Sequence, residues 1–308
     1  MKENPLKSNE ISPSARPNII MFAVLLYWLF VPDHVLIPHV ISPIENALGL
    51  YPITGLAWRS ITWFLNLGIP IVVYLVYLLI AKKPIKSAFS ISKLSAKNVF
   101  YVAIFTLAIR AVDLLATRFI PFALGSWTLQ TSGTIGEALI LGALFAAVYE
   151  EFNFRGFLYS EYRNQRVSIL KISLATGLFF GLIHSGIAVF TTAIFGIMWT
   201  YMLYYTRSIW APLLSHLIYN GLGILLNPIY HANNQAEYES LMSTLLIATA
   251  IAAVLLIPAA VVCVKRFMRE NRHNAIKKSE LPIESKAFTI TYWLLIAVMI
   301  AVIFIFRL

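Results

Sequence analysis

The stretch that decides the fold is TIGEALILGALFAAVYEEFNFRGFLYSEYR, residues 134–163. It is long and mostly apolar, yet it carries Glu150, Glu151 and Arg155 well inside the run. Ionisable side chains at membrane depth are costly and usually mark a functional site. Glu151 and Arg155 are four residues apart, so they can pair along one side of a helix. That pairing leaves Glu150, which lies one position away on the helix, available for a different role.

The composition indicates a membrane protein rather than a soluble one. Of 308 residues, 59% are hydrophobic and only 12% are charged, whereas a soluble domain carries about 25% charged residues. The net charge of +10 comes from basic residues that gather in a few loops, which is typical of the positive-inside rule rather than of nucleic-acid binding. Cys263 is the only cysteine, so an intrachain disulfide is excluded. We therefore expect an all-α polytopic membrane protein that binds membrane lipids and no nucleic acid.

The apolar stretches predict nine spans. They lie at about 18–37, 58–81, 99–124, 134–163, 167–186, 187–205, 210–226, 241–264 and 287–306. The corresponding parts are a cytoplasmic N-terminal tail at 1–18, an eight-helix intramembrane domain at 19–264 with its motif core at 134–226, a basic cytoplasmic linker at 265–286, and an extra C-terminal transmembrane helix at 287–308. The basic loops all fall inside when the N-terminus is cytoplasmic, and this topology suits a prokaryotic plasma membrane.

Proline and glycine predict one irregular region near the N-terminus. Pro32, Asp33 and His34 are expected to interrupt the first span, and a loop rich in Pro and Gly is expected from Pro38 to Gly55. Proline inside a helix removes a hydrogen bond and clashes with the preceding turn. We therefore expect a break rather than a helix between the first two spans.

Two further motifs repeat the placement of polar groups in apolar stretches. They are Phe180-x-x-x-His184 and His216-x-x-x-Asn220. At about 1.5 Å per helical residue, Glu150 lies about 13 Å deep and His216 about 12 Å deep. Three helices are therefore predicted to bring carboxylates, imidazoles and a carboxamide to a similar level in the membrane.

Such a cluster could hydrolyse a peptide bond. A Glu150 carboxylate held near a histidine could take a proton from water, and His216 and Asn220 could donate hydrogen bonds to the resulting oxyanion. A zinc site with Glu150, His184 and His216 as ligands is an alternative, because two histidines and one glutamate form a familiar set. No His-Glu-x-x-His sequence is present, so zinc is not implied and no cofactor is required.

Other intramembrane proteases fit this sequence less well. Asp33 and Asp113 are the only aspartates, and neither lies in a Gly-x-Gly-Asp sequence. A rhomboid-like Gly-x-Ser-Gly is also absent. The residues therefore favour a glutamate-type reaction over an aspartyl or a serine one.

The three motifs together resemble the CPBP family of CAAX proteases and bacteriocin-processing enzymes, also called the Abi family. Its pattern is Glu-Glu-x-x-x-Arg, then Phe-x-x-x-His, then His-x-x-x-Asn or Asp, and the resemblance covers about 137–223. It implies an α-helical intramembrane endopeptidase of the glutamate type, acting on a peptide or lipidated protein. By resemblance, Glu150 and His184 activate water. By the same resemblance, His216 and Asn220 form the oxyanion site, while Glu151, Arg155 and Phe180 support them.

Less specific readings of the same residues stay open. The fold could belong to a catalytically silent immunity or peptide-binding protein, or to a transporter with an intramembrane proton site. Glu151 with Arg155 could be a purely structural ion pair, as Arg110 with Asp113 is expected to be. Gly177 and Gly181 are expected to permit close helix packing.

Overall fold

The computed structural model describes most of the helical part of the chain. The described residues are 23–24, 27, 31–49, 55–80, 82, 84–85, 89–119, 134–164, 167–184, 188–227, 235–274, 292–293, 296–297 and 300. The predicted tail at 1–18, half of the first span and most of the predicted ninth span therefore lie outside the described residues.

Three helical stretches are long and apolar enough to cross a membrane. The first is Leu56–Ile80, the second is Ala96–Ala116 within α6 (Ala96–Phe119), and the third is Ala236–Glu270 within α13 (Gln235–Glu270). The first stretch combines α3 (Gly55–Trp63), η4 (Phe64–Gly68) and α4 (Ile69–Ile80). Apart from an isolated bridge between Ile91 and Ser208, the regular structure of the described residues is helical. The chain is an all-α integral membrane protein, as its composition predicts.

The stretch 134–163 forms one continuous helical rod, as its sequence predicts. Its parts are α7 (Ile135–Ala138), η6 (Leu139–Phe145), α8 (Ala146–Glu151), η7 (Phe152–Leu158) and α9 (Tyr159–Asn164). The Thr134 hydroxyl accepts a hydrogen bond from the Glu137 backbone, and the Glu137 side chain accepts one from the Thr134 backbone. This capping box fixes the start of the rod. Two π-helical segments flank α8, and π-helical turns frequently occur at functional sites.

Three further helices pack against one another beside the rod. They are α10 (Ile169–Leu182), α11 (Ala188–Thr206) and α12 (Trp210–Leu225). A Cβ on Gly177 would lie 2.8 Å from the Ala193 carbonyl oxygen, and one on Gly181 would lie 2.5 Å from the Val189 carbonyl oxygen. Side chains at these positions would push α10 and α11 apart, so the close packing expected of Gly177 and Gly181 is confirmed.

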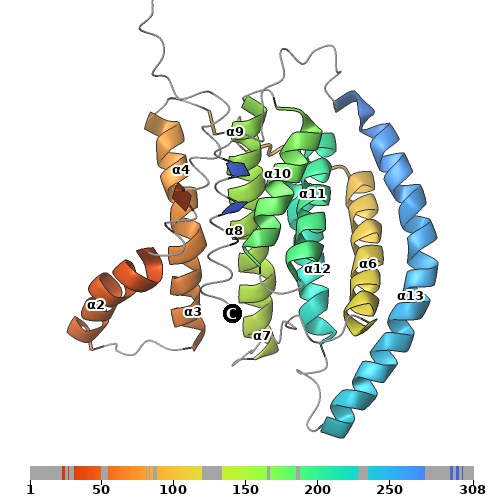
Figure 1. Ribbon diagram of the computed structural model, residues 1–308, viewed down its shortest axis with the longest axis horizontal. Coiled ribbons are helices and arrows are strands. Elements are labelled where there is room, and N and C mark those ends of the chain that lie inside the picture. The colour runs from red at the N-terminus through yellow and green to blue at the C-terminus, as the bar shows by residue number, and fades with distance from the viewer. Residues whose placement is uncertain are drawn as a thin grey trace, which may run out of the picture.

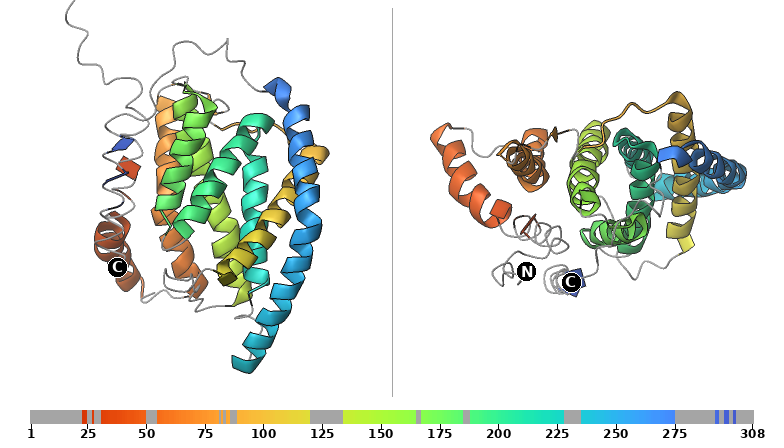
Figure 2. Two further views of the ribbon diagram at one scale, coloured as in Figure 1. Left: turned by 45° about the vertical axis from the view of Figure 1, so that its right-hand side comes forward. Right: turned by 90° about the horizontal axis from the view of Figure 1, so that it is seen from above.

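The rod lies at the centre of the layered arrangement in Figures 1 and 2, with α3 and α4 on one side. On the other side lie α10, α11 and α12, while α6 and α13 are outermost. The segments that carry the three motifs are therefore inside the bundle, where neighbouring helices surround them.

The structure corrects the prediction of a loop in the proline-rich region. Residues Pro32–Ile41 form the π-helical segment η3, and Ser42–Ala47 form α2. The two segments adjoin, so residues 32–47 form one continuous helical run that includes Pro32, Pro38 and Pro43. The predicted break is wrong because local π-helical adjustments in membrane helices can satisfy the backbone groups that a proline leaves free.

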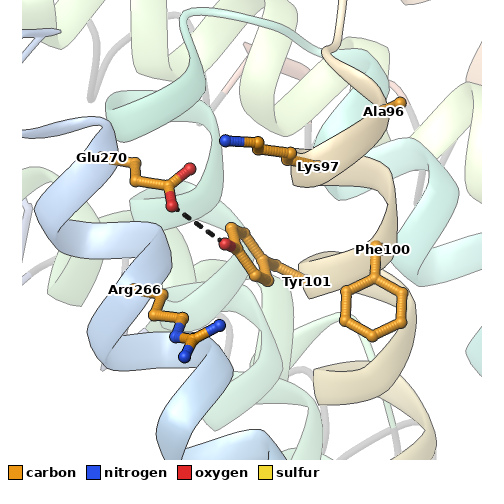
Figure 3. Close-up of a pocket in the computed structure, with 6 residues that line it drawn as sticks. All are labelled: Ala96, Lys97, Phe100, Tyr101, Arg266 and Glu270. Carbon is orange, nitrogen blue, oxygen red and sulfur yellow. Dashed lines mark hydrogen bonds between the residues drawn. The ribbon is translucent and has the colours of Figure 1, made fainter.

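The end of α13 extends beyond the predicted limit at residue 264 and reaches Glu270. A reciprocal pair of hydrogen bonds joins Asn98 of α6 to Asn271, at 3.1 and 2.9 Å. The Tyr101 hydroxyl donates to Glu270 Oε1 at 3.0 Å, as Figure 3 shows. Packing against α6 therefore keeps the polar residues after 264 helical.

The basic residues gather at one end of the bundle, which we call the basic end. Here α9 and α13 end, while α6 and α10 begin (Figure 1). The Arg207 Nη2 donates to the Asn274 carbonyl oxygen at 2.6 Å, and the Ser208 hydroxyl donates to the Ser92 carbonyl oxygen at 2.6 Å. These contacts bring three separate basic segments together. The predicted topology requires this, because it places the basic loops on one face of the membrane. Which face of the membrane this is stays a prediction.

Candidate active site

The candidate site starts with the ion pair that the Glu-Glu-x-x-x-Arg spacing predicts. Arg155 Nη1 donates to Glu151 Oε1 at 3.1 Å, and both side chains are completely buried. The other end of the guanidinium donates from Nη2 to the Gly196 carbonyl oxygen of α11 at 2.8 Å. The guanidinium carbon also lies 4.7 Å from the centroid of the Phe180 ring. Arg155 therefore joins the rod to both α10 and α11 while it neutralises Glu151.

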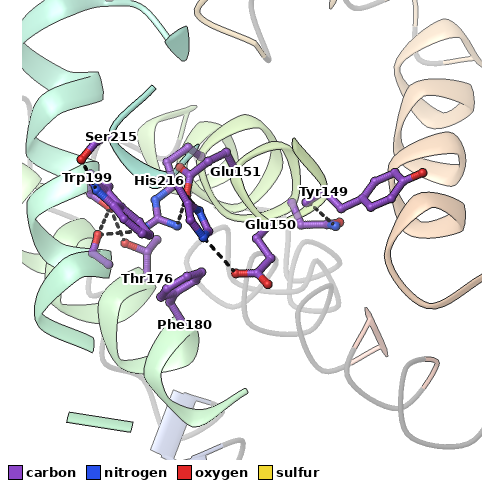
Figure 4. Close-up of polar contacts among 12 residues, drawn as sticks. Tyr149, Glu150, Glu151, Thr176, Phe180, Trp199, Ser215 and His216 are labelled. Atoms are coloured by element: carbon purple, nitrogen blue, oxygen red, sulfur yellow. Dashed lines mark hydrogen bonds and ion pairs between the residues drawn. The ribbon is translucent and has the colours of Figure 1, made fainter. Parts of the chain in front are cut away.

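His216 lies between the two glutamates, as Figure 4 shows. Its Nδ1 is 3.0 Å from Glu151 Oε1, and its Nε2 is 3.9 Å from Glu150 Oε2. An ionised carboxylate can only accept hydrogen bonds, so Nδ1 carries the proton that points at Glu151. In the neutral ring, Nε2 then holds the lone pair that faces Glu150.

Glu150 differs from Glu151 in its surroundings, although the two are neighbours in the chain. It is 8% exposed, and its Oε2 is buried without a hydrogen-bond partner among the described residues. In Figure 4 the carboxylate points toward His216. Glu151 holds the arginine, and Glu150 keeps an oxygen that can accept a proton from a bound water.

The Phe180-x-x-x-His184 motif lies at the end of α10. His184 Nδ1 is 2.7 Å from the Phe180 carbonyl oxygen, so Nδ1 is protonated because a carbonyl oxygen can only accept. The Phe180 ring lies 4.9 Å from the His184 ring and 6.0 Å from the His216 ring. Phe180 therefore borders both histidines. The predicted partnership of Glu150 and His184 stays a prediction, whereas a close approach of Glu150 to His216 is present.

Asn220 has a partner on the rod. Its Nδ2 donates to the Gly142 carbonyl oxygen of η6 at 3.0 Å. This bond uses one of the two amide protons and leaves the second for another acceptor. The proposed oxyanion role of Asn220 therefore rests on the second proton, with the first holding the amide in place.

Sequence reasoning missed the aromatic support of His216. The Trp199 ring of α11 stacks on the His216 ring, with centroids 4.2 Å apart and planes 21° apart. The Trp199 indole N–H donates to the Ser215 hydroxyl at 2.8 Å, and Ser215 and Thr106 share a hydrogen bond of 2.7 Å. Thr106 gives its own proton to the Val102 carbonyl oxygen, so Ser215 must be the donor to Thr106. No fixed spacing links these positions to the motifs, and only the folded chain shows the connection.

A metal ligand set is not assembled in the described part of the chain. No group of three or more His, Cys, Asp or Glu side chains there is placed to hold a metal ion. The zinc ligands considered as an alternative, Glu150, His184 and His216, therefore do not form such a group. Glu151 and His216 instead hydrogen bond directly to each other.

The comparisons with known proteins bear on the same segment. Residues 134–222 match the family model described as type II CAAX prenyl endopeptidase Rce1-like. No curated protein and no solved structure matches the chain. The matched segment begins at the helix cap Thr134 and includes all three motifs through Asn220. Residues 134–222 are therefore similar to the Rce1-like family, in agreement with the CAAX-protease resemblance that the three motifs carry.

Proposed function

We propose that the chain is an intramembrane endopeptidase that hydrolyses a peptide bond of a membrane-associated or lipidated peptide. One observation carries this proposal. Within the segment that matches the CAAX endopeptidase family, a buried Glu150 oxygen without a hydrogen bond lies 3.9 Å from a histidine that Glu151 orients. A carboxylate with an imidazole nearby supplies the base that hydrolysis needs.

In the proposed reaction a water molecule binds to the Glu150 carboxylate, with His184 assisting. Glu150 takes one proton as the water oxygen attacks the peptide carbonyl carbon. The carbonyl oxygen becomes an oxyanion, and its hydrogen-bond donors are the second proton of the Asn220 amide and the Nε2–H that His216 carries in its doubly protonated form. Glu150 then returns its proton to the leaving nitrogen, the carbon–nitrogen bond breaks, and a carboxylic acid and an amine are released.

The surrounding residues hold this arrangement in place. Glu151 fixes the His216 ring from one side, and Trp199 covers one face of that ring. Arg155 keeps Glu151 ionised, because removing the guanidinium would leave a buried carboxylate without its counterion. A preorganised polar site in a water-poor bundle stabilises the transition state more than the same groups would in water.

The substrate class follows from the family and from the position of the site. The family description names prenyl endopeptidases of the CAAX type, so a peptide with a lipid-modified cysteine near its C-terminus is the first candidate. The lipid chain would hold such a peptide at the bundle and raise its local concentration. We infer that the basic end faces the cytoplasm of a prokaryotic cell, because basic loops lie on the cytoplasmic side of the membrane.

The test uses the purified full-length chain in liposomes with two synthetic peptides of the same sequence, one farnesylated and one not. We expect the farnesylated peptide to be cut into two fragments that mass spectrometry identifies. Glu150→Gln should abolish the cut, and Asp113→Asn, which changes a carboxylate outside the site, should retain it. No cleavage by a folded wild-type protein, or equal cleavage by Glu150→Gln, would contradict the proposal.

A further inference from the structure

A surface groove at the basic end has an unusual charge distribution. It has a volume of about 600 Å³ and is lined by Ser90, Ile91, Ser92, Arg163 and Arg207. Among the lining residues that the structure describes, two are arginines and none is acidic. The groove lies where α9 ends, next to the turn between α11 and α12, and therefore away from Glu150.

Arg207 is held rigidly in this groove. Its Nη2 donates to the Asn274 carbonyl oxygen at 2.6 Å, and its guanidinium carbon lies 5.6 Å from the Tyr204 ring centroid. Its backbone has a φ of 54°, in the left-handed region that L residues seldom adopt. Its Nη1 is buried without a hydrogen-bond partner among the described residues. A fixed donor of this kind is ready for an acceptor that the protein itself does not supply.

Arg163 adds a second positive charge beside the first. Burial lowers the pKa of Arg207, and the nearby Arg163 lowers it further because two like charges repel. Neither arginine forms an ion pair with a carboxylate in the described ranges of the chain. Two adjacent guanidinium groups without an acid between them favour the binding of an anion.

The neighbouring groove in Figure 3 provides a contrast. It lies between α6 and α13, and its lining includes Lys97, Arg266 and Glu270, so an acid is present among the bases. The Tyr101 hydroxyl also satisfies one oxygen of that acid. The described lining of the groove at Arg163 and Arg207 contains no such counterion, and this groove is therefore the stronger anion site.

We propose that the Arg163–Arg207 groove binds the phosphate group of an anionic ligand. Arginine donates two parallel hydrogen bonds to the oxygens of a phosphate group. Two arginines and two serines offer more hydrogen-bond donors than a carboxylate ligand would use, so phosphate is the better match. At the surface of a membrane protein, the headgroup of an anionic phospholipid is one source of such a group. Free phosphate is the other. This inference does not depend on the proposed peptidase activity, because the groove is separate from the candidate site.

The test measures binding to the full-length protein in a neutral detergent. Short-chain phosphatidylglycerol, short-chain phosphatidylcholine and inorganic phosphate are titrated separately, and the melting temperature gives an apparent Kd for each. Arg163→Gln should weaken anion binding about tenfold or more, because it removes a charged donor. Arg163→Lys keeps the charge but loses the planar fork, so it should weaken binding less.

Arg269→Gln is the matched control, because it removes one exposed positive charge from the same end of the bundle but outside the groove. Stabilisation by phosphatidylglycerol that depends on Arg163 but not on Arg269 supports a lipid headgroup. The same dependence with inorganic phosphate supports a soluble ligand for the same site. An equal response of wild type, Arg163→Gln and Arg269→Gln would overturn the proposal, as would the absence of any stabilisation by either anion.

Discussion

Two arginine–carboxylate clusters in this bundle, the first partly buried and the second fully buried at its ion pair, are arranged differently. In the first, Arg110 Nη1 donates to Asp113 Oδ2 at 2.7 Å, and the Tyr219 hydroxyl donates to the same oxygen at 2.7 Å. In the second, Arg155 pairs with Glu151, and Glu150 and His216 lie beside them. In the first cluster one arginine pairs with the only carboxylate, whereas in the second cluster one arginine is accompanied by two carboxylates.

The difference indicates which cluster can perform chemistry. Asp113 has its buried charge balanced and two donors on one oxygen, which is the requirement for a structural pair in a membrane. Glu150 and Glu151 each keep one buried oxygen without a hydrogen bond in the described part of the chain. An incompletely satisfied buried acid is costly, and it persists where function requires it. We therefore propose a structural role for the Arg110 cluster and a catalytic role for the Glu150 cluster.

The largest expected effect is the loss of activity on changing Glu150. Glu150→Gln keeps the size of the side chain but removes the base, and general-base catalysis contributes roughly 100- to 10,000-fold in rate. The melting temperature should stay within a few degrees of wild type, since Glu150 makes no buried hydrogen bond from Oε2. Initial cleavage rates and thermal unfolding of the same preparations check both statements. A fully active variant would remove Glu150 from the mechanism.

Arg155→Ala should damage both folding and activity. It leaves Glu151 buried without its cation and also breaks the bond to the Gly196 carbonyl, and breaking a buried pair costs about 3–5 kcal/mol. Denaturant unfolding in detergent micelles measures this loss. Arg155→Lys retains the charge and should recover part of the stability. An unchanged unfolding midpoint for Arg155→Ala would show that the pair is not structurally required.

Asn220→Ala should slow the reaction without a comparable loss of stability. Removing one oxyanion donor typically costs about 100- to 1000-fold in rate, and the bond to the Gly142 carbonyl contributes about 1 kcal/mol to folding. The ratio kcat/KM for a fluorogenic peptide tests this, with KM expected to change little. A change confined to KM would indicate that Asn220 binds substrate rather than the oxyanion.

Asp113→Asn should show the opposite pattern to Glu150→Gln. It removes the counterion of Arg110 and weakens the bond from Tyr219, so we expect a loss of about 1.5–3 kcal/mol in the free energy of unfolding. Cleavage per folded molecule should be nearly unchanged. If Asp113→Asn instead abolished cleavage in a well-folded protein, the division between the two clusters would be wrong.

The smallest effect is expected from Ser215→Ala. It leaves the Trp199 indole N–H without its acceptor, which should cost about 1 kcal/mol. The cleavage rate should fall several-fold, because Trp199 stacks on His216 and helps to orient it. Ser215→Thr retains the hydroxyl and serves as the control. Rate and thermal unfolding measured together separate a local change at His216 from a general loss of folding.

The features predicted from sequence are those that depend on local spacing. The pair of Glu151 and Arg155, the pair of Arg110 and Asp113, and the packing at Gly177 all follow from residues three or four positions apart on a helix. The rod at 134–163 also follows from its long and mostly apolar sequence.

The features that were not predicted join residues far apart in the chain. Trp199 contacts His216 through the packing of α11 on α12, and Asn220 bonds to Gly142 across more than seventy residues. The extension of α13 depends on Asn98 meeting Asn271. No periodicity encodes such contacts, because they depend on how whole helices are placed. The helical run through Pro32, Pro38 and Pro43 was missed for a different reason, namely that a membrane helix can accommodate proline through local π-helical adjustment.

The most direct test compares new peptide termini in membranes from cells that produce wild type, Glu150→Gln or Asp113→Asn at equal levels. Mass spectrometry of these termini identifies both the substrate and the cleaved bond. We predict a set of termini that is present with wild type and Asp113→Asn and absent with Glu150→Gln. The same termini in all three membranes would contradict the assignment of the Glu150 cluster to peptide hydrolysis.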